Sequence, residues 1–140
     1  MKKIILILAM TLGLIGGVMA QSERKFDPAR FNQELQQFIT SEAGLTPQEA
    51  ADFFPLYSEM RKKARVIFGE MHRLKRIKPA DDAGCKENIR RRDELDLQMK
   101  ELHQMYHNKF FNVLPASKVY DVLKAEDLFH RKMFKKAKAK

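Results

Sequence analysis

The sequence feature that most constrains the fold of this chain is a long apolar repeat in its middle. From Ala50 to Leu74, apolar residues recur at alternating spacings of three and four. An α-helix places such residues along one stripe, and a stripe this long is typical of two long helices packed against each other. The sequence therefore predicts a helix over about residues 46–77. The stripe comprises Ala50, Phe53, Tyr57, Met60, Ala64, Ile67, Met71 and Leu74.

This helix has a well-defined expected start. Thr46 and Glu49 form a capping box, in which each side chain accepts a hydrogen bond from the other residue's backbone amide. Pro47 suits the first helical position. Pro55 lies further in and removes one backbone hydrogen bond, so we expect a bend near residues 51–55.

Three further helices are expected around this one. Asp27 as N-cap and Gly44 as a stop predict a helix over residues 27–42. After a turn at residues 79–84, a second long helix is expected over 86–113, and Pro115 then opens a shorter one. Residues 135–140 are expected to form a frayed basic tail. The stripe of the second long helix comprises Leu95, Met99, Leu102, Tyr106, Phe110 and Val113.

The predicted fold is therefore all-α. Two long helices joined by a short turn pack antiparallel, which gives a long, bent helical hairpin with two shorter flanking helices. Ten Phe and three Tyr are many for so thin a structure, so we expect a homodimer that buries part of the surplus.

The first twenty residues have the pattern of a secretory signal peptide. Lys2 and Lys3 precede an apolar run from Ile4 to Ile15, and Ala20 ends a small-residue cleavage site. We therefore expect a periplasmic protein with a single domain over residues 21–140. No later stretch approaches the roughly 20 apolar residues of a membrane helix, so no transmembrane segment is expected beyond this leader.

The net charge limits the classes of binding partner, and the cysteine count limits the possible disulfides. Taking Lys2 and Lys3 from the 27 basic residues leaves 25 against 18 acidic ones, a net charge of +7. Such an excess favours anionic lipid, lipopolysaccharide, nucleic acid or unfolded polypeptide, and export makes nucleic acid the poorest of these. Cys85 is the only cysteine, so it is either a free thiol or part of an intermolecular bridge.

No catalytic motif stands out, so we expect a protein that is not an enzyme. The chain has no glycine-rich phosphate loop, no HExxH and no CxxC. His103 and His107 lie one helical turn apart and are candidate ligands for zinc or another divalent metal. No third ligand has a fixed spacing to them, so a place on a solvated flank of the helix is the favoured interpretation.

Two stripes that mix basic and aromatic residues flank the apolar stripes. A surface of this kind suits weak, sequence-tolerant contact with partly unfolded chains, although a solvated helix face is the simpler alternative. The candidate client-binding residues are Arg61, Arg65, Phe68, His72 and Lys75 on the first long helix and Lys100, Lys109 and Phe110 on the second.

The segment Leu45-Thr46-Pro47-Gln48-Glu49 resembles the LTxxQ motif of the Spy/CpxP family. That family has a second copy before its last helix, where this chain has Leu114 but Pro115 and Lys118 in place of Thr and Gln. Glu49 also replaces the motif Gln, which a capping box tolerates. The motif residues Leu45, Thr46, Glu49 and Leu114 are expected to have structural roles.

The resemblance implies a bent four-helix protomer that dimerises into a cradle. Spy-like members bind unfolded or misfolded envelope proteins on a basic concave face without ATP. CpxP-like members also restrain a sensor kinase in the envelope stress response, and other relatives are heavy-metal sensors. The leading hypothesis is therefore a periplasmic holdase, and the alternative is a metal-binding regulator of envelope stress signalling.

Overall fold

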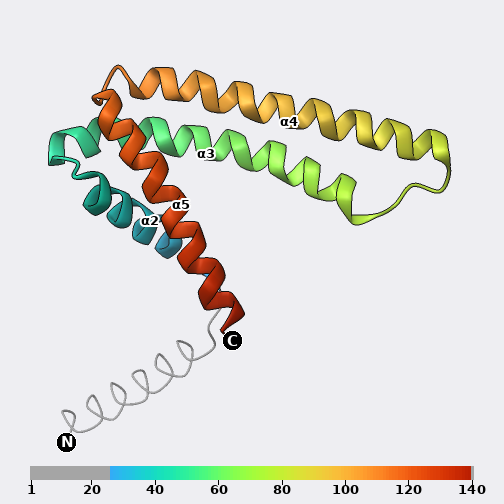
Figure 1. The fold of residues 1–140 in the computed structure, drawn as a ribbon, viewed down its shortest axis with the longest axis horizontal. Coiled ribbons are helices and arrows are strands. Elements are labelled where there is room, and N and C mark those ends of the chain that lie inside the picture. Colours follow the sequence, from blue (N-terminus) through green and yellow to red (C-terminus); the bar gives the residue numbers. More distant parts are fainter. Residues whose placement is uncertain (1–25, 140) are drawn as a thin grey trace, which may run out of the picture. The chain divides into compact units, whose positions relative to one another are not determined.

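The computed structural model describes residues 26–139 of the 140-residue chain. The described residues form four helices and no strand, which confirms the all-α class (Figure 1). None of these helices combines the length and apolar character that crossing a membrane would need. The expected leader over residues 1–20 lies outside the described residues. The helices are α2 (Pro28–Ala43), α3 (Pro47–Arg76), α4 (Asp82–Phe110) and α5 (Ala116–Lys138).

The chain divides into two compact units, with a boundary between Asn32 and Gln33 inside α2. In the first unit, the Asp27 carboxylate accepts a hydrogen bond from the Ala29 amide at 3.0 Å, so the expected N-cap is confirmed. The ring centroids of Phe26 and Phe31 lie 5.7 Å apart in the same unit. The second unit contains the rest of α2 and the other three helices.

The junction of α2 and α3 follows the expected local signals. Gly44 adopts a φ of +61°, a left-handed conformation that glycine tolerates and that ends α2. The Thr46 hydroxyl accepts from the Glu49 amide at 3.1 Å, and the Glu49 carboxylate accepts from the Thr46 amide at 2.9 Å. The capping box is thereby confirmed. α3 continues past Pro55, and the expected bend there stays a prediction.

α4 differs from its expected bounds at both ends, and it ends at Phe110 rather than 113. α4 begins at Asp82 rather than 86, because the Asp81 carboxylate caps it by accepting from the Gly84 amide at 2.8 Å. Gly84 is required there, since an added Cβ would lie 2.9 Å from the Cβ of Pro79. α5 continues to Lys138, so residues 135–138 are helical in the structure, and the expected fraying of residues 135–140 stays a prediction.

α3 and α4 lie side by side and run in opposite directions (Figure 1). Near the start of α3, the Tyr106 hydroxyl donates to the Glu59 carboxylate at 2.7 Å. Further along, Arg91 pairs with Glu70 at 2.7 Å. The stripes meet in a buried aromatic cluster of Phe53, Tyr57, Tyr106 and Phe110, with 4.7 Å between the Phe53 and Phe110 ring centroids.

α5 packs its first half against the other helices of this unit. Its buried residues are Val119, Val122, Ala125 and Phe129, and the Phe129 ring lies 5.5 Å from that of Phe38 in α2. The Tyr57 hydroxyl donates to the Glu126 carboxylate at 2.6 Å, which joins α3 to α5. These contacts set one face of α5 opposite α3 and α4, and that placement creates the pocket described next.

Candidate functional site

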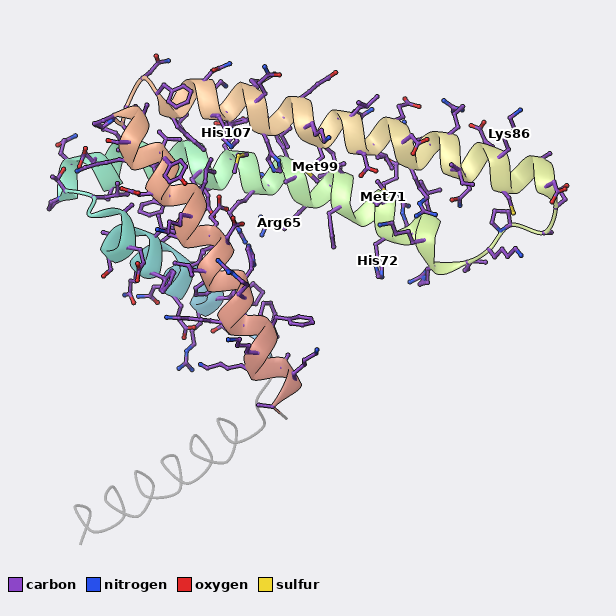
Figure 2. All side chains as sticks on the ribbon, viewed as in Figure 1. Arg65, Met71, His72, Lys86, Met99 and His107 are labelled. Carbon is purple, nitrogen blue, oxygen red and sulfur yellow. The ribbon has the colours of Figure 1, made fainter. Side chains whose placement is uncertain are left out.

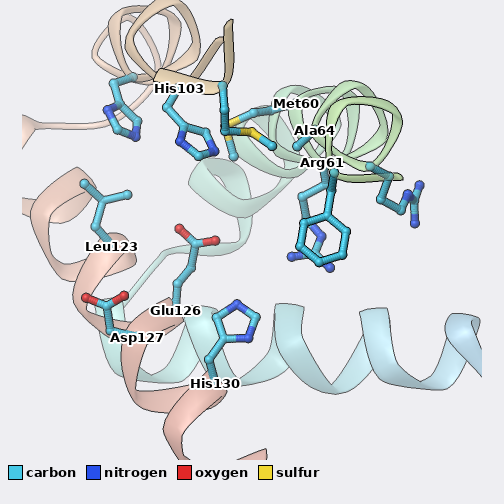
Figure 3. A pocket seen from close by; sticks show the side chains of 12 residues that line it. Met60, Arg61, Ala64, His103, Leu123, Glu126, Asp127 and His130 are labelled. Atoms are coloured by element: carbon cyan, nitrogen blue, oxygen red, sulfur yellow. The ribbon is translucent and has the colours of Figure 1, made fainter. Parts of the chain in front are cut away.

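A pocket of about 590 Å³ opens among α3, α4 and α5 (Figure 3). Three helices supply its walls, so we call it the three-helix pocket. Its volume lies within the range typical of sites for small ligands or short peptide segments. Its lining residues are Met60, Arg61, Ala64, Arg65, Phe68, Met99, His103, His107, Leu123, Glu126, Asp127 and His130.

Each wall follows from the helical repeat. On α3, Arg61, Arg65 and Phe68 are spaced by four and three residues and therefore share one face. His103 and His107 are one turn apart on α4 and contribute the second wall. Figure 2 shows Arg65 and His72 extending from the same side of α3. Part of each face predicted from the sequence thus lines one pocket, whereas His72 lies outside it.

The base of the pocket is apolar. Met60 is buried, and Ala64, Met99 and Leu123 are half-buried around it. Phe68 is 67% exposed at the wall, and its ring stacks on that of His72 with 6.5 Å between centroids. A half-buried apolar base beside an exposed aromatic ring can accept an apolar side chain from a partner and remove it from water.

The charged groups of the pocket lie on facing walls. Arg61 and Arg65 come from α3, whereas Glu126 and Asp127 come from α5 (Figure 3). Glu126 is held in place by the Tyr57 hydroxyl. Burial, and then the Glu126 charge, raise the pKa of Tyr57, so its hydroxyl remains protonated and keeps donating to that carboxylate.

The two α4 histidines stack on each other at the pocket wall. Their rings are nearly parallel, with 6.1 Å between centroids. Burial and the neighbouring His103 lower the pKa of His107, while Glu126 acts in the opposite direction. A lowered pKa favours the neutral imidazole at neutral pH, which leaves His107 able both to donate and to accept a hydrogen bond.

Sequence reasoning missed the wall supplied by α5. Leu123, Glu126, Asp127 and His130 are spaced by three, one and three residues, so they share a face of that helix. That spacing was readable in the sequence. Which elements the face would meet was not, because it depends on the contacts of Tyr57 with Glu126 and of Phe38 with Phe129.

Two of the expected client-binding residues lie elsewhere. Phe110 is fully buried against Phe53, so the expectation that it makes exposed apolar contacts was wrong. Lys109 lies over the Tyr106 ring, with 4.6 Å from Nζ to the centroid. Lys109 does not line the pocket. It is two residues from His107, and side chains two positions apart on a helix point in different directions.

Lys75 and Lys100 also lie outside the three-helix pocket. Lys100 is exposed on α4. Lys75 lines a smaller pocket of about 210 Å³ at the turn between α3 and α4, together with Cys85, Lys78 and Arg92. Cys85 is a free, half-buried cysteine, with its Sγ 3.7 Å from the Pro79 carbonyl oxygen.

A metal ion has no ready-made cluster among residues 26–139. No three His, Cys, Asp or Glu side chains of this part of the chain are placed to hold one. His103 and His107 remain the candidate pair, and the same pocket is also lined by Glu126, Asp127 and His130. The fourth ring, His72, stacks on Phe68 instead.

The residues of the two expected motif copies meet in space. Leu45 and Leu114 are buried, and Lys118 pairs with Glu49 at 2.5 Å. Lys118 also donates to the Gly44 carbonyl at 2.9 Å. Hydrogen bonds from Lys118 and Thr46 lower the pKa of Glu49, so its carboxylate stays ionised as acceptor. These contacts fasten the start of α5 to the start of α3.

Comparisons of this chain with protein-family models, with curated proteins and with solved structures found no match.

Proposed function

We propose that this protein is an ATP-independent holdase of the bacterial periplasm, which binds unfolded or misfolded envelope proteins through the three-helix pocket. One observation carries the proposal: a single open pocket combines the exposed Phe68 ring and an apolar base with the Arg61 and Arg65 guanidinium groups. The resemblance of residues 45–49 to the LTxxQ motif supports the same role and suggests a non-catalytic member of the Spy/CpxP family.

The chemistry of the pocket suits weak and tolerant binding. Met60, Met99 and Phe68 can contact many apolar side chains, since methionine is flexible and an aromatic ring offers a large contact area. Arginine stems extend this apolar surface while their charged ends remain in water. A pocket open to solvent at its mouth would let a client segment enter and leave without any step driven by nucleotide.

The test is suppression of aggregation, followed by light scattering of a denatured model client in metal-free buffer without ATP. We expect the wild-type protein to suppress scattering at a stoichiometric ratio. The variant Arg61→Ala/Arg65→Ala/Phe68→Ala is expected to lose most of this activity, because it removes the exposed aromatic and both cations of one wall.

A matched control makes the same type of change elsewhere on α3. Lys62, Val66 and Arg73 are exposed and do not line the pocket, so Lys62→Ala/Val66→Ala/Arg73→Ala removes two cations and one exposed apolar side chain as well. Equal loss of activity in both variants would show that the pocket is not the client site. No suppression by the wild type at any ratio would reject the holdase role.

The alternative is a metal-binding regulator of envelope stress signalling, acting on a sensor kinase or another regulator. It draws support from the stacked His103 and His107 rings at the wall of an open pocket. Zinc titration by calorimetry separates the two roles. A His103→Ala/His107→Ala variant with unchanged zinc affinity would remove this alternative.

Export and assembly complete the proposal. We expect the chain to be cleaved after Ala20 on export and to form a homodimer. The mass of the protein recovered from the periplasm of an expressing cell tests the first point, and a mass that retains residues 1–20 would contradict it.

A further inference from the structure

The last part of α5 extends beyond the core. Phe129 is the last buried residue of this helix. From residue 130 to 138 every residue is exposed except the half-buried Met133, although the helix continues to Lys138 (Figure 1). About two and a half helical turns therefore lie mostly outside the packing of the first half of α5, and the contacts that remain are those of half-buried Met133 and of Lys132 with the Phe38 ring. We call residues 130–138 the cationic end.

Basic residues dominate this segment. No Asp or Glu follows Asp127 in the sequence. Cations near a helix C-terminus compensate the helix dipole, but this effect is confined to the last turn. It accounts for Lys135, Lys136 and Lys138. Lys132 instead lies over the Phe38 ring of α2, with 4.8 Å from Nζ to the centroid. Neither contact explains Arg131, which lies further back on the helix. The basic residues after Asp127 are Arg131, Lys132, Lys135, Lys136, Lys138 and Lys140.

An exposed aromatic residue lies among these cations. Phe134 is 64% exposed, and the Lys138 ammonium is 5.2 Å from its ring centroid. Arg131, Phe134 and Lys138 are spaced by three and four residues and so form one row along the helix. Compensation of the helix dipole needs no aromatic ring. Lys and Arg together with an exposed Phe are the residue types with which a helix at a lipid–water interface contacts headgroups and the acyl boundary.

We propose that the cationic end of α5 docks on the surface of an anionic lipid bilayer. The lysine and arginine ends would contact lipid phosphates, their stems would lie along the headgroup region, and the Phe134 ring would enter the boundary with the acyl chains. Charge complementarity supplies the attraction, and the exposed ring favours a lipid surface over a purely polar polyanion. This role is separate from that of the three-helix pocket. The cationic end and the pocket lining share a single residue, His130.

The test is co-sedimentation of the exported protein with vesicles. The protein is purified after export, with the N-terminus that cellular processing produces. One set of vesicles contains phosphatidylglycerol mixed with phosphatidylcholine, and the other contains phosphatidylcholine alone. We expect binding to the anionic vesicles only. Arg131→Gln/Lys135→Gln/Lys138→Gln, which changes three cations on the face of the helix that carries Phe134, should weaken it about a hundredfold at low salt, since each cation near an anionic surface contributes a factor of about five.

Two further variants make the result specific. Lys62→Gln/Arg73→Gln/Lys86→Gln removes three exposed cations from α3 and α4 and should bind nearly as well as the wild type. Phe134→Ser leaves the charge unchanged and should weaken binding to anionic vesicles, with helix content checked by circular dichroism. Equal loss in both charge variants, or no binding by the wild type, would overturn the proposal.

An acidic polypeptide is the competing partner. Polyglutamate could bind the cationic end as tightly as the vesicles do, with Phe134→Ser weakening neither interaction. This result would show that the segment recognises negative charge alone. That result would also overturn docking on a bilayer. Stronger binding to vesicles, weakened by Phe134→Ser, would support it.

Discussion

Glu49 connects two helices that are far apart in the sequence. Its carboxylate accepts from the Thr46 amide at the start of α3 and pairs with Lys118 in the first turn of α5. Thr46 completes the arrangement, because its hydroxyl accepts from the Glu49 amide. The capping box of α3 therefore also positions α5, the helix that supplies one wall of the pocket.

Thr46→Ala should lower the free energy of unfolding by about 1 kcal/mol, because the Glu49 amide loses its side-chain acceptor. Thermal or urea unfolding monitored by circular dichroism measures this change. Ser58→Ala is the matched control, since Ser58 is exposed within the same helix and caps nothing. Equal stability of the Thr46→Ala variant and the wild type would contradict the role of the cap.

The position of α5 depends on a hydrogen bond that crosses between elements. Tyr57 is 1% exposed, yet its hydroxyl reaches Glu126 on α5 at 2.6 Å. In Tyr57→Phe the ring can stay in place while this bond is lost, so we expect a loss of about 1 kcal/mol. Amide hydrogen exchange in α5 should become faster, and exchange near Met71 in α3 should change little.

Tyr120→Phe is the control for this prediction. Tyr120 is also on α5 but is 69% exposed, so removal of its hydroxyl should leave exchange unchanged. Similar exchange in the wild type and in Tyr57→Phe would mean that the apolar contacts of Val122 and Phe129 hold α5 without help from Glu126.

The elements themselves were predictable because local rules determine them. The stripe from Ala50 to Leu74 and the capping box at Thr46 predicted α3 nearly to its ends. The start of α4 was misplaced because Asp81 and Gly84 also fit a turn, and the hydrogen bond from the Gly84 amide to the Asp81 carboxylate shows that they cap the helix. Local signals thus predict which residues are helical better than where each helix begins.

The candidate site was predictable only in part. Arg61, Arg65 and Phe68 share a face by spacing alone, and so do His103 and His107. That these two faces meet the same face of α5 depends on long-range packing, which no spacing encodes. Phe110 illustrates the limit, since an aromatic residue at the edge of a stripe can belong to the core or to the surface, and here it is fully buried.

Charge is distributed unevenly over the molecule. The chain has a formal net charge of +9, yet Arg61 and Arg65 in the pocket face Glu126 and Asp127. The basic surface expected at the client site is therefore balanced by carboxylates from α5. A further run of positive charge, with six basic residues and no Asp or Glu, follows Asp127. Apolar contact, rather than net charge, should dominate client binding in the pocket, while charge should dominate at the cationic end.

Large apolar side chains remain exposed outside the pocket, which is why we expect a homodimer. Leu97 is 62% exposed and Phe111 is 50% exposed, and their spacing of fourteen residues places them on one side of α4. Pairing two copies along this side would bury both residues and follow the two-fold symmetry usual for dimers. Sedimentation velocity over a wide range of protein concentrations should show a monomer–dimer equilibrium.

Leu97→Ser/Phe111→Ser should shift this equilibrium toward the monomer, because the apolar area that favours association is lost while the core residues Leu95 and Phe110 are untouched. Ile77→Ser serves as control, since Ile77 is 71% exposed but lies in the turn after α3. A dimer that survives the double variant would place the interface on another surface. A monomer at every concentration would mean that this exposed apolar face does not pair with a second copy and binds a different partner. A client or a folded envelope protein would then be the next candidate to test against it.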